Sequence, residues 1–576
     1  MRKLLLAFCA FATICSAGAQ WKPAGDKIKT DWAEKVDPRN VLPEYPRPGM
    51  ERADWQNLNG EWEYAILPKG QAEPTSFDGN ILVPFAVESS LSGVQKEVGE
   101  KNELWYKRTF TVPSSWKGKD ILLNFGAVDW KADVFVNDIL IGSHTGGFTP
   151  FSLNITPYLN GKSTHKLVVR VWDPSDKGYQ PRGKQVANPE GIWYTPVTGI
   201  WQTVWLEPVA SSHITSIKAI PNIDNGVMSV TVGACSDSPV SDIVEVSLLD
   251  KGQVVATAKG VQGTELRLAV QNPTLWEPSN PYLYDMKVSL SKNGKKVDEV
   301  KSYTAFRKIS AERDANGIMR MRLNNKNLFQ YGPLDQGWWP DGLYTAPTDE
   351  ALLYDIVKTK AWGFNMIRKH VKVEPARWYY HCDKEGMLVW QDMPSGDHGN
   401  RWEPHVYNGG TDKNRSDESI ANYYQEWKEI MDLCISHPSV VMWVPFNEAW
   451  GQFKTEEVIA WTKKYDPSRL VNPASGGNHR ACGDVLDLHN YPGPNMFLFD
   501  AVRVNVLGEY GGIGLPLEGH LWQQGKNWGY VQFKNSDEVT AEYVKFANEL
   551  KDMVKRGFSA AVYTQTTDVD GEVNGL

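Results

Sequence analysis

The stretch Val440-Val441-Met442-Trp443-Val444-Pro445-Phe446 is apolar throughout and leads directly into Asn447-Glu448. A short continuous apolar run is typical of a strand of parallel sheet that is buried on both faces. A carboxylate that directly follows such a strand is expensive to bury unless it is paired or used. The stretch therefore predicts a buried strand whose C-terminal end carries chemistry.

Similar short apolar segments recur on both sides of this one, and helical patterns such as residues 350–362 alternate with them. The eight segments are residues 328–331, 365–368, 388–390, 440–443, 470–472, 485–488, 504–507 and 560–563. Eight strand–helix units in about 265 residues are what a (β/α)₈ barrel requires. We therefore predict a C-terminal TIM barrel over residues 311–576.

The preceding residues show an all-β pattern, in which short alternating strands are separated by Gly, Pro, Asn and Asp. Residues 51–210 are typical of a jelly-roll β-sandwich, and residues 211–310 have the size and strand rhythm of an immunoglobulin-like β-sandwich. Residues 20–50 are rich in proline and charge and predict an extended lead-in. The two sandwiches can either bind carbohydrate or act only as scaffold.

The first residues have the features of a secretory signal peptide. Arg2 and Lys3 precede a short apolar run, and Ala17-Gly18-Ala19 provides a small-residue cleavage site. We therefore expect residues 1–19 to be removed and the protein to be periplasmic or secreted. No later stretch is apolar enough to cross a membrane, and the net charge of −8 contains no long runs of one sign. Neither a membrane nor a nucleic-acid partner is expected.

Cysteine usage gives little functional information. Four cysteines follow the signal segment, and they are far apart without CxxC spacing: Cys235, Cys382, Cys434 and Cys482. They are either isolated thiols or form a disulfide that cannot be paired from sequence. Because clusters with zinc-ligand spacing are missing from the sequence, no cofactor or metal ion is expected.

A second carboxylate occupies the same kind of position as Glu448. The seventh predicted strand, residues 504–507, ends in Gly508-Glu509. Strands four and seven stand on opposite sides of a barrel, so their C-terminal ends can face each other across its mouth. Hydrolysis of a glycosidic bond needs such a pair of carboxyl groups on either side of a sugar ring. The sequence therefore predicts a glycosidase with a carbohydrate substrate.

Several longer motifs resemble glycoside hydrolase family 2, which contains β-galactosidases, β-glucuronidases and β-mannosidases. The resemblance extends over nearly the whole chain after the signal segment. It rests on Trp55-Gln56-Asn57-Leu58-Asn59-Gly60-Glu61-Trp62, Gly146-Gly147-Phe148, Gly199-Ile200-Trp201-Gln202-Thr203-Val204-Trp205, Leu275-Trp276-Glu277-Pro278-Ser279-Asn280-Pro281-Tyr282-Leu283-Tyr284, His437-Pro438-Ser439 and Asn447-Glu448.

The resemblance implies roles for four residues. Glu509 would be the nucleophile that forms a covalent glycosyl-enzyme, and Glu448 would be the acid/base of a retaining mechanism. Asn447 would hydrogen-bond the 2-hydroxyl of the sugar, and Tyr491 would orient the nucleophile.

Other polar or aromatic residues at strand ends are candidates for binding the terminal sugar. They are Asp335, Trp338, Arg368, His370, Asp392, Trp450 and His489. For two of them a structural alternative stays open: Arg368 can be part of an ion pair that closes the barrel, and Asp335 can accept backbone N–H groups and cap its loop. Trp338 and Trp450, together with Trp339, can form a wall on which a sugar stacks.

The identity of the sugar is less determined than the chemistry. β-Glucuronidases of the family carry an Asn-x-Lys that holds the uronate, whereas this chain has Asn574-Gly575-Leu576. A carboxylate at Asp335 would also repel a uronate, so we expect a neutral terminal sugar and β-galactosidase-like exo action. The alternatives are a β-glucuronidase, a β-mannosidase, an arabinosidase, an endo-acting enzyme or an inactive carbohydrate-binding relative. The oligomeric state cannot be predicted.

Overall fold

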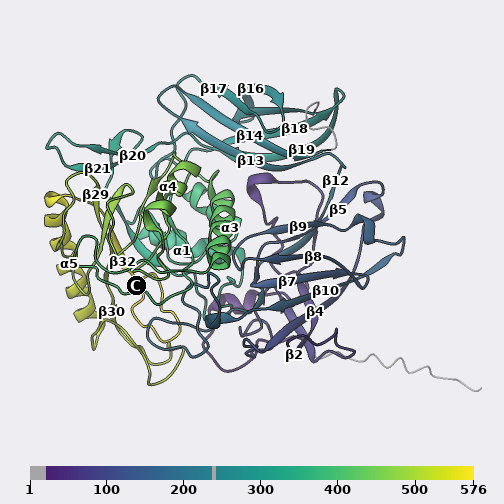
Figure 1. Ribbon diagram of the computed structural model, residues 1–576, viewed down its shortest axis with the longest axis horizontal. Helices are drawn as coiled ribbons and strands as arrows, with labels where there is room; N and C mark the ends of the chain where they lie inside the picture. The colour runs from purple at the N-terminus through teal and green to yellow at the C-terminus, as the bar shows by residue number, and fades with distance from the viewer. Residues whose placement is uncertain (1–20, 237–241) are drawn as a thin grey trace, which may run out of the picture.

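A computed structural model describes residues 21–236 and 242–576, which form two β-sandwiches and a parallel barrel (Figure 1). The predicted fold class is therefore confirmed. The signal segment predicted over residues 1–19 lies outside the described residues. Within the described ranges, no helix combines the length and the apolar character that a membrane span requires.

The first sandwich packs a six-stranded sheet, with the order β3-β2-β4-β10-β7-β8, against a four-stranded sheet, with the order β1-β12-β5-β9. The strands are β1 (Gln56–Asn57), β2 (Gly60–Pro68), β3 (Gly79–Val83), β4 (Asn102–Thr111), β5 (Asp120–Phe125), β7 (Lys131–Val136), β8 (Ile139–Thr145), β9 (Phe151–Asn154), β10 (Thr164–Trp172) and β12 (Val204–Val209). Alternate residues of β7 are buried, as expected for a strand with one face on a core. A short pair, β6 (Val128–Asp129) and β11 (Gly199–Ile200), lies beside the two sheets.

The second sandwich packs a three-stranded sheet, β13-β14-β17, against a four-stranded sheet, β16-β15-β18-β19. Its strands are β13 (His213–Asn222), β14 (Val227–Cys235), β15 (Ile243–Asp250), β16 (Gln253–Val261), β17 (Glu265–Ala269), β18 (Tyr284–Lys292) and β19 (Lys295–Thr304). A separate three-stranded sheet follows before the barrel begins, formed by β20 (Ile309–Arg313), β21 (Met319–Leu323) and β22 (Lys326–Asn327).

Eight parallel strands form the barrel in the order β27-β26-β25-β24-β23-β32-β29-β28. They are β23 (Gln330–Asp335), β24 (Met366–Lys369), β25 (Leu388–Asp392), β26 (Val440–Val444), β27 (Leu470–Val471), β28 (Val485–His489), β29 (Val504–Gly511) and β32 (Phe558–Thr564). All eight coincide with or overlap the segments predicted from sequence. The barrel is almost closed. Strand β27 is short, and a backbone hydrogen bond from the Asp484 amide to the Val471 carbonyl (2.9 Å) helps to link it to β28.

The expectation of eight strand–helix units was wrong, because the described residues contain five α-helices. They are α1 (Asp349–Ala361), α2 (Ala376–Glu385), α3 (Asp417–Cys434), α4 (Thr455–Tyr465) and α5 (Ser536–Arg556). The connections from β27 to β28 and from β28 to β29 contain no helix. Both carry proline and glycine, including Pro473, Gly476, Pro492 and Gly493. Proline lacks the amide that a helix interior needs, and glycine pays the largest entropic penalty there.

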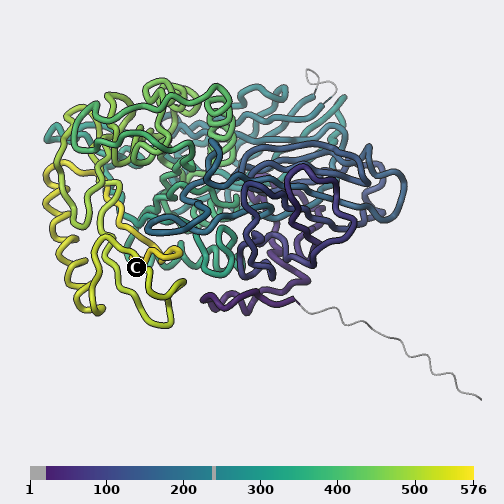
Figure 2. Tube along the Cα trace, turned by 60° about the horizontal axis from the view of Figure 1, so that its bottom comes forward, coloured from purple at the N-terminus to yellow at the C-terminus, as the bar shows by residue number. Residues whose placement is uncertain are grey.

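The first sandwich and the barrel share one hydrophobic core. Phe148, Tyr194 and Trp201 of the sandwich side pack with Tyr344 of the barrel. The hydroxyl groups of Tyr194 and Tyr344 are also hydrogen-bonded at 2.8 Å. In Figure 2, a loop of the blue trace extends over the green part of the chain. The first sandwich is therefore built into the barrel domain rather than tethered to it.

The four cysteines of the described residues are free thiols. Cys382 and Cys434 are buried, Cys482 is partly buried and Cys235 is exposed. Of the two alternatives left open by the sequence, the structure therefore has isolated thiols.

Candidate active site

The two predicted catalytic carboxylates lie together at the C-terminal end of the barrel. Glu509 belongs to β29, and Glu448 follows β26 in a turn where its own φ is 45° and that of Ala449 is 66°. This left-handed conformation is uncommon for residues other than glycine, and the Glu448 carboxylate reaches His489 from this turn. Oxygen atoms of Glu448 and Glu509 and a ring nitrogen of His489 all lie within 4.8 Å of one another.

Glu509 accepts two hydrogen bonds and lies near a ring nitrogen of His489. The Arg368 guanidinium donates to its Oε1 (3.0 Å), and the Tyr491 hydroxyl donates to its Oε2 (2.6 Å). His489 Nδ1 lies 3.5 Å from the same Oε2. Burial raises the pKa of Glu509, but His489 and Arg368 lower it by more, so the pKa lies well below the ordinary value. The carboxylate is therefore ionised at neutral pH, as a nucleophile must be.

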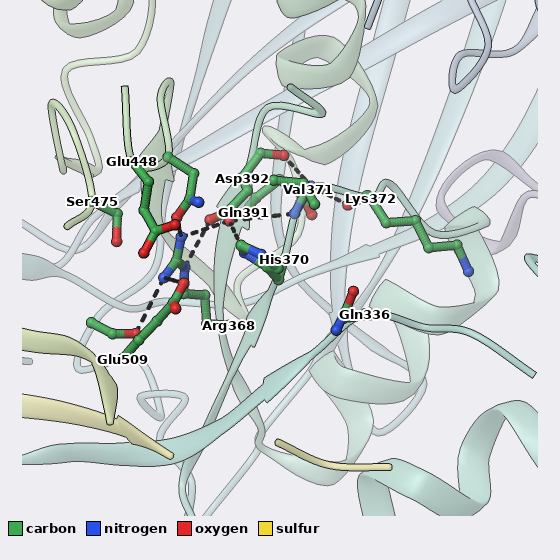
Figure 3. Close-up of polar contacts among 12 residues, drawn as sticks. Gln336, Arg368, His370, Val371, Lys372, Gln391, Asp392, Glu448, Ser475 and Glu509 are labelled. Atoms are coloured by element: carbon green, nitrogen blue, oxygen red, sulfur yellow. Dashed lines mark hydrogen bonds and ion pairs between the residues drawn. The ribbon is translucent and has the colours of Figure 1, made fainter. Parts of the chain in front are cut away.

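Arg368 connects the groups beneath the two carboxylates (Figure 3). It donates from Nε and from one terminal nitrogen to the two oxygens of Asp392 (3.1 and 2.9 Å), and to Asn447 Oδ1 (2.7 Å). Burial lowers the pKa of Arg368, and Asp392 and Glu509 raise it by more, so the guanidinium stays charged. This geometry favours the ion-pair alternative for Arg368, because all three of its nitrogens are bonded within the protein, and one of these ion pairs includes the predicted nucleophile.

Asp392, predicted to bind sugar, has its oxygens occupied within the protein. Besides Arg368, it accepts hydrogen bonds from His370 Nδ1 (3.0 Å) and from the Val371 amide (3.3 Å). The side chain is 1% exposed. It fixes Arg368 and His370 in place, so we infer a positioning role for this residue rather than direct contact with the sugar.

Two predicted sugar-binding residues retain unused polar atoms. Asn447 Oδ1 accepts from Arg368, but its Nδ2 is buried without a partner in the part of the chain that the structure describes. Burial and the nearby cations hold the pKa of His370 well below its ordinary value, so the ring is neutral. Because Asp392 accepts from Nδ1, the Nε2 of His370 is left as an acceptor. Asn447 therefore offers a donor and His370 an acceptor to a ligand.

His489 lies between the two carboxylates and takes part in a chain of hydrogen bonds. Its Nδ1 is 2.8 Å from Glu448 Oε1, and its Nε2 is 2.8 Å from Ser475 Oγ. The Ser475 hydroxyl donates its own proton to Asp487 (2.6 Å), so it can only accept from His489. One proton is therefore shared between Glu448 and His489. Burial lowers the pKa of His489, and Glu509 and Glu448 raise it by more, so the net shift is upward.

Asp335 lies at the end of β23 with both oxygens occupied. Its Oδ1 accepts from the Gly337 amide (2.8 Å), and its Oδ2 accepts from Lys369 Nζ (2.7 Å). Lys369 also pairs with Glu374 (2.8 Å). This geometry favours the alternative in which Asp335 caps its loop. Lys369 neutralises the charge of Asp335, so this carboxylate is not expected to repel a uronate. The expectation of a neutral sugar therefore loses this support.

The tryptophans considered as a stacking wall are placed differently from one another. Trp338 is buried against Trp522, with ring centroids 5.0 Å apart, and Trp339 is also buried. Trp450 is partly buried and packs against Trp193 (5.2 Å) and His370 (6.3 Å). Of the three, only Trp450 adjoins a candidate sugar-binding residue.

An open cleft of about 500 Å³ lies beside Glu448. Aromatic side chains from four separate segments line it: Trp193, Trp402, Tyr491, Trp528 and Tyr530. The Trp402 ring nitrogen donates to the Gly476 carbonyl (2.9 Å), which fixes the orientation of an indole that is 45% exposed. Aromatic faces of this kind bind the apolar faces of sugar rings or aryl groups.

Sequence reasoning missed this cleft as well as Ser475 and Asp487. Trp193 lies in the first sandwich, so only tertiary packing reveals its place at the barrel mouth. A signal was available for Asp487, because it alternates with His489 in an otherwise apolar strand and successive residues of a strand point to opposite faces. An ionisable residue inside a buried strand is itself a sign of a site.

Glu448, His489 and Glu509 are also the residues that could hold a metal ion, since each offers one ligand atom within 4.8 Å of the others. All three groups are already bonded within the protein: Glu448 to His489, His489 also to Ser475, and Glu509 to Arg368 and Tyr491. Shared protons and charge-assisted hydrogen bonds therefore account for the close approach of the three groups.

The barrel, the two sandwiches and the facing carboxylates together define the class of protein as a multidomain glycosidase. Comparison with known proteins then identifies the family. Residues 81–194 match the galactose-binding domain-like model of glycosyl hydrolase 2, residues 212–307 match glycosyl hydrolases family 2, and residues 343–491 match the TIM barrel domain of that family. The chain belongs to glycosyl hydrolases family 2.

Similar proteins carry more than one activity in their names. A β-galactosidase from Thermoanaerobacter pseudethanolicus is 25% identical over 415 residues, which cover 69% of this chain and 52% of that protein. A β-glucuronidase from Paenibacillus borealis is 25% identical over 453 residues, covering 74% and 73%. This chain spans about half the length of the first of these relatives.

The fold also matches solved structures. A β-glucuronidase from Ruminococcus gnavus in complex with D-glucuronic acid superimposes with a TM-score of 0.71, at 19% identity, over 93% of this chain and 96% of that chain. A β-D-glucuronidase from Dictyoglomus thermophilum gives a TM-score of 0.71 at 19% identity. At this identity the likeness concerns the fold.

Proposed function

We propose that the protein is a retaining glycosidase that removes a terminal sugar through a covalent glycosyl-enzyme. The observation that carries the proposal is the approach of Glu448 and Glu509, whose oxygens lie within 4.8 Å. Retaining glycosidases hold their two carboxyl groups about 5–5.5 Å apart, whereas inverting enzymes leave about 6.5–9.5 Å for a water molecule. The short separation supports direct attack by one carboxylate.

In the first step Glu509 attacks the anomeric carbon, while the bond to the leaving oxygen breaks. Glu448 gives that oxygen a proton, so the leaving group departs as a neutral alcohol and Glu448 becomes an anion. His489 can stabilise this anion, because its Nδ1 lies 2.8 Å from Glu448 Oε1. Tyr491 and Arg368 keep the attacking carboxylate oriented.

In the second step Glu448 takes a proton from water, whose oxygen attacks the anomeric carbon. The ester bond to Glu509 breaks, and the sugar leaves with its original configuration. Asn447 Nδ2 is a free donor beside this site, which supports the predicted contact with the 2-hydroxyl. Such a contact strengthens as positive charge develops on the sugar ring.

The leaving group would bind in the aromatic cleft next to Glu448. A pyranose or an aryl group suits the exposed faces of Trp402 and Trp528. The terminal sugar itself can be a galactoside, as expected from the sequence, or a glucuronide, a mannoside or an arabinoside. We further propose that the predicted signal segment exports the enzyme to the periplasm or beyond, where a carbohydrate substrate is accessible.

The test is a panel of 4-nitrophenyl glycosides, followed by NMR of the first anomer formed from the best substrate. We expect the product to appear with the configuration of the substrate and to mutarotate only later. First appearance of the opposite anomer would refute the retaining mechanism. Failure of the wild-type protein to cleave any glycoside would favour the inactive carbohydrate-binding alternative.

A further inference from the structure

A lysine of the first sandwich reaches the mouth of the barrel. Lys184 lies on the loop between η5 (Ser175–Lys177) and β11, and it is 5% exposed. The amides of Arg182 and Gly183 donate to the Ser395 carbonyl, just beyond β25, at 2.9 and 3.1 Å. Gly183 has a φ of 64°, and a Cβ there would lie 2.7 Å from the Val371 carbonyl. Glycine at 183 therefore lets the loop dock closely enough to bury Lys184.

The Lys184 ammonium group has no hydrogen-bond or ion-pair partner among residues 21–236 and 242–576. The Lys184 Nζ lies over the Trp450 ring, 5.9 Å from its centroid. The other buried cations at this end of the barrel are paired: Arg368 with Asp392 and Glu509, and Lys369 and Lys372 with Glu374. The Lys184 Nζ is not among the buried polar atoms without a partner, so the ammonium is open to the site although most of the residue is buried. A charge that the protein leaves unpaired and accessible at the barrel mouth is available to an acceptor supplied by a ligand.

The charge of Lys184 acts on the side of the site where the terminal sugar would sit. It is among the charges that lower the pKa of Glu509, after His489 and Arg368, against the effect of burial. Burial raises the pKa of Glu572, and Lys184 is the first of the groups that lower it. Lys184 does not line the aromatic cleft beside Glu448. Lys184 therefore lies within electrostatic range of the nucleophile, beside Trp450 and His370, and is not part of the leaving-group cleft.

Unused acceptor capacity lies beside Glu572, the carboxyl group on which the Lys184 charge acts. Gln336 donates its amide protons to Gln565 Oε1 (2.6 Å) and Glu572 Oε2 (3.1 Å), which leaves its own Oε1 buried without a donor. Glu572 is buried among these amides. A ligand that offers an oxygen to Lys184 and a hydroxyl proton to Gln336 would satisfy both.

We propose that Lys184 is a substrate-binding residue, contributed by the jelly-roll sandwich, that donates a charge-assisted hydrogen bond to an oxygen substituent on the terminal sugar. The oxygen belongs either to a ring hydroxyl or to the carboxylate of a uronic acid, and both present the same acceptor chemistry. The inference rests on the proposed glycosidase function and assigns a specificity-determining residue to it.

The experiment compares Lys184→Met and Lys184→Arg with the wild type on 2,4-dinitrophenyl and 4-nitrophenyl galactosides and glucuronides. We expect Lys184→Met to lower kcat/KM roughly 10- to 100-fold on the preferred sugar, the scale of a lost charge-assisted hydrogen bond. Lys184→Arg should recover part of the loss. A loss confined to the glucuronide assigns the carboxylate, and a loss on the galactoside assigns a hydroxyl.

The kinetic step affected distinguishes substrate binding from a structural role. The terminal sugar stays bound in the glycosyl-enzyme, so Lys184→Met should also lower kcat on the dinitrophenyl substrate, for which hydrolysis of the intermediate limits the rate. Trp402→Ala, in the leaving-group cleft, should lower kcat/KM on a disaccharide without this effect on kcat. The exposed Lys177, on the same segment, provides the control Lys177→Met, which should leave both constants unchanged.

Unchanged kinetics of folded Lys184→Met on every glycoside that the wild type cleaves would overturn the proposal. A lower melting temperature with unchanged kinetics would assign a structural role instead. If the wild type cleaves no glycoside, the proposed function fails separately. The role of Lys184 is then tested by the increase in melting temperature that galactose or glucuronate produces: loss of this increase in Lys184→Met supports the proposal, and its persistence or its absence from the wild type overturns it.

Discussion

Two buried networks of charged side chains lie at the same end of the barrel, and they differ in how fully their polar atoms are satisfied. In the first, Lys369 bridges Asp335 and Glu374, and Lys372 donates to Glu374 and to the carbonyls of Gly337 and Tyr344. No side-chain atom of these four ionic residues is among the buried unpartnered atoms of residues 21–236 and 242–576. Figure 3 shows Lys372 pointing away from the group around Arg368.

The second network, around Arg368, is equally buried but incomplete. Within the described ranges, Asn447 Nδ2 is buried without a partner, and the accessible Lys184 ammonium, which lies over Trp450, has no hydrogen-bond or ion-pair partner. A network that is satisfied internally stabilises the fold, whereas unused donors and acceptors are available to a ligand. The comparison teaches that burial and charge alone do not mark an active site. Unsatisfied polar atoms beside the carboxylates distinguish the second network from the first.

The largest expected effect is a loss of activity when the second network loses the Glu509 carboxylate. Glu509→Gln removes the nucleophile, and we expect kcat to fall by roughly 10⁴-fold or more. The side chain keeps its shape and can still accept from Tyr491, so the melting temperature should change little. Steady-state kinetics and thermal denaturation of the same preparation provide the check. Substantial residual turnover would show that Glu509 is not the nucleophile.

Loss of the acid should depend on the leaving group. Glu448→Ala should lower kcat/KM by roughly 10²- to 10⁴-fold on a disaccharide, because a poor leaving group needs a proton. The loss should be much smaller on a dinitrophenyl glycoside, whose leaving group departs without one. Azide or formate should then restore turnover by replacing the missing carboxylate in the second step. Equal losses on both substrates would contradict the role of Glu448.

The first network should respond in stability instead. Lys369→Met leaves Asp335 and Glu374 buried without their shared cation, and we expect the free energy of unfolding to fall by about 3–5 kcal/mol. Lys35→Met breaks an exposed pair with Glu350 and should change it by about 1 kcal/mol or less. Urea denaturation measures both. A stable Lys369→Met variant with lost activity would place the first network in the active site.

The pH profile should reveal the proton shared by Glu448 and His489. A raised pKa means that His489 keeps its proton to higher pH than a free imidazole, so the pair remains able to donate above pH 6.5 and loses this ability as pH rises further. In His489→Asn the new side chain cannot hold the proton, so only the carboxyl group of Glu448 can. A carboxyl group loses its proton at lower pH than an imidazole does. The alkaline limb of kcat/KM in His489→Asn should therefore move to lower pH. An unmoved limb would assign it to another group.

The smallest effect on catalysis should come from Asp335. In Asp335→Asn the side chain can still accept from the Gly337 amide, so kcat/KM should stay close to wild type while the melting temperature falls. The test is to measure kcat/KM on the best aryl glycoside for Asp335→Asn and for Asp392→Asn, a variant that disturbs Arg368. The loss should be smaller in Asp335→Asn. A larger kinetic loss in Asp335→Asn than in Asp392→Asn would restore the sugar-binding interpretation of Asp335.

Local sequence patterns predicted the barrel strands and the positions of Glu448 and Glu509, because burial on both faces produces continuous apolar runs and chemistry sits where these runs end. The same logic could not separate Asp335 from Glu509, since both follow apolar strands. Their difference depends on Lys369, which reaches Asp335 from a strand 34 residues away. Lys184 and Trp193 belong to a loop of another domain, and nothing in their local pattern places them at the barrel mouth.

The docking of the loop around Gly183 has a consequence for how such an enzyme diversifies. Residues that touch the terminal sugar need not belong to the domain that carries out the chemistry, so a change of preference can arise by altering a sandwich loop and leaving every catalytic strand intact. Tyr194 and Tyr344 join the two domains in one core, so the sandwich cannot be exchanged as an independent module. The loop can therefore vary on its own, whereas an exchanged sandwich would have to rebuild the shared core.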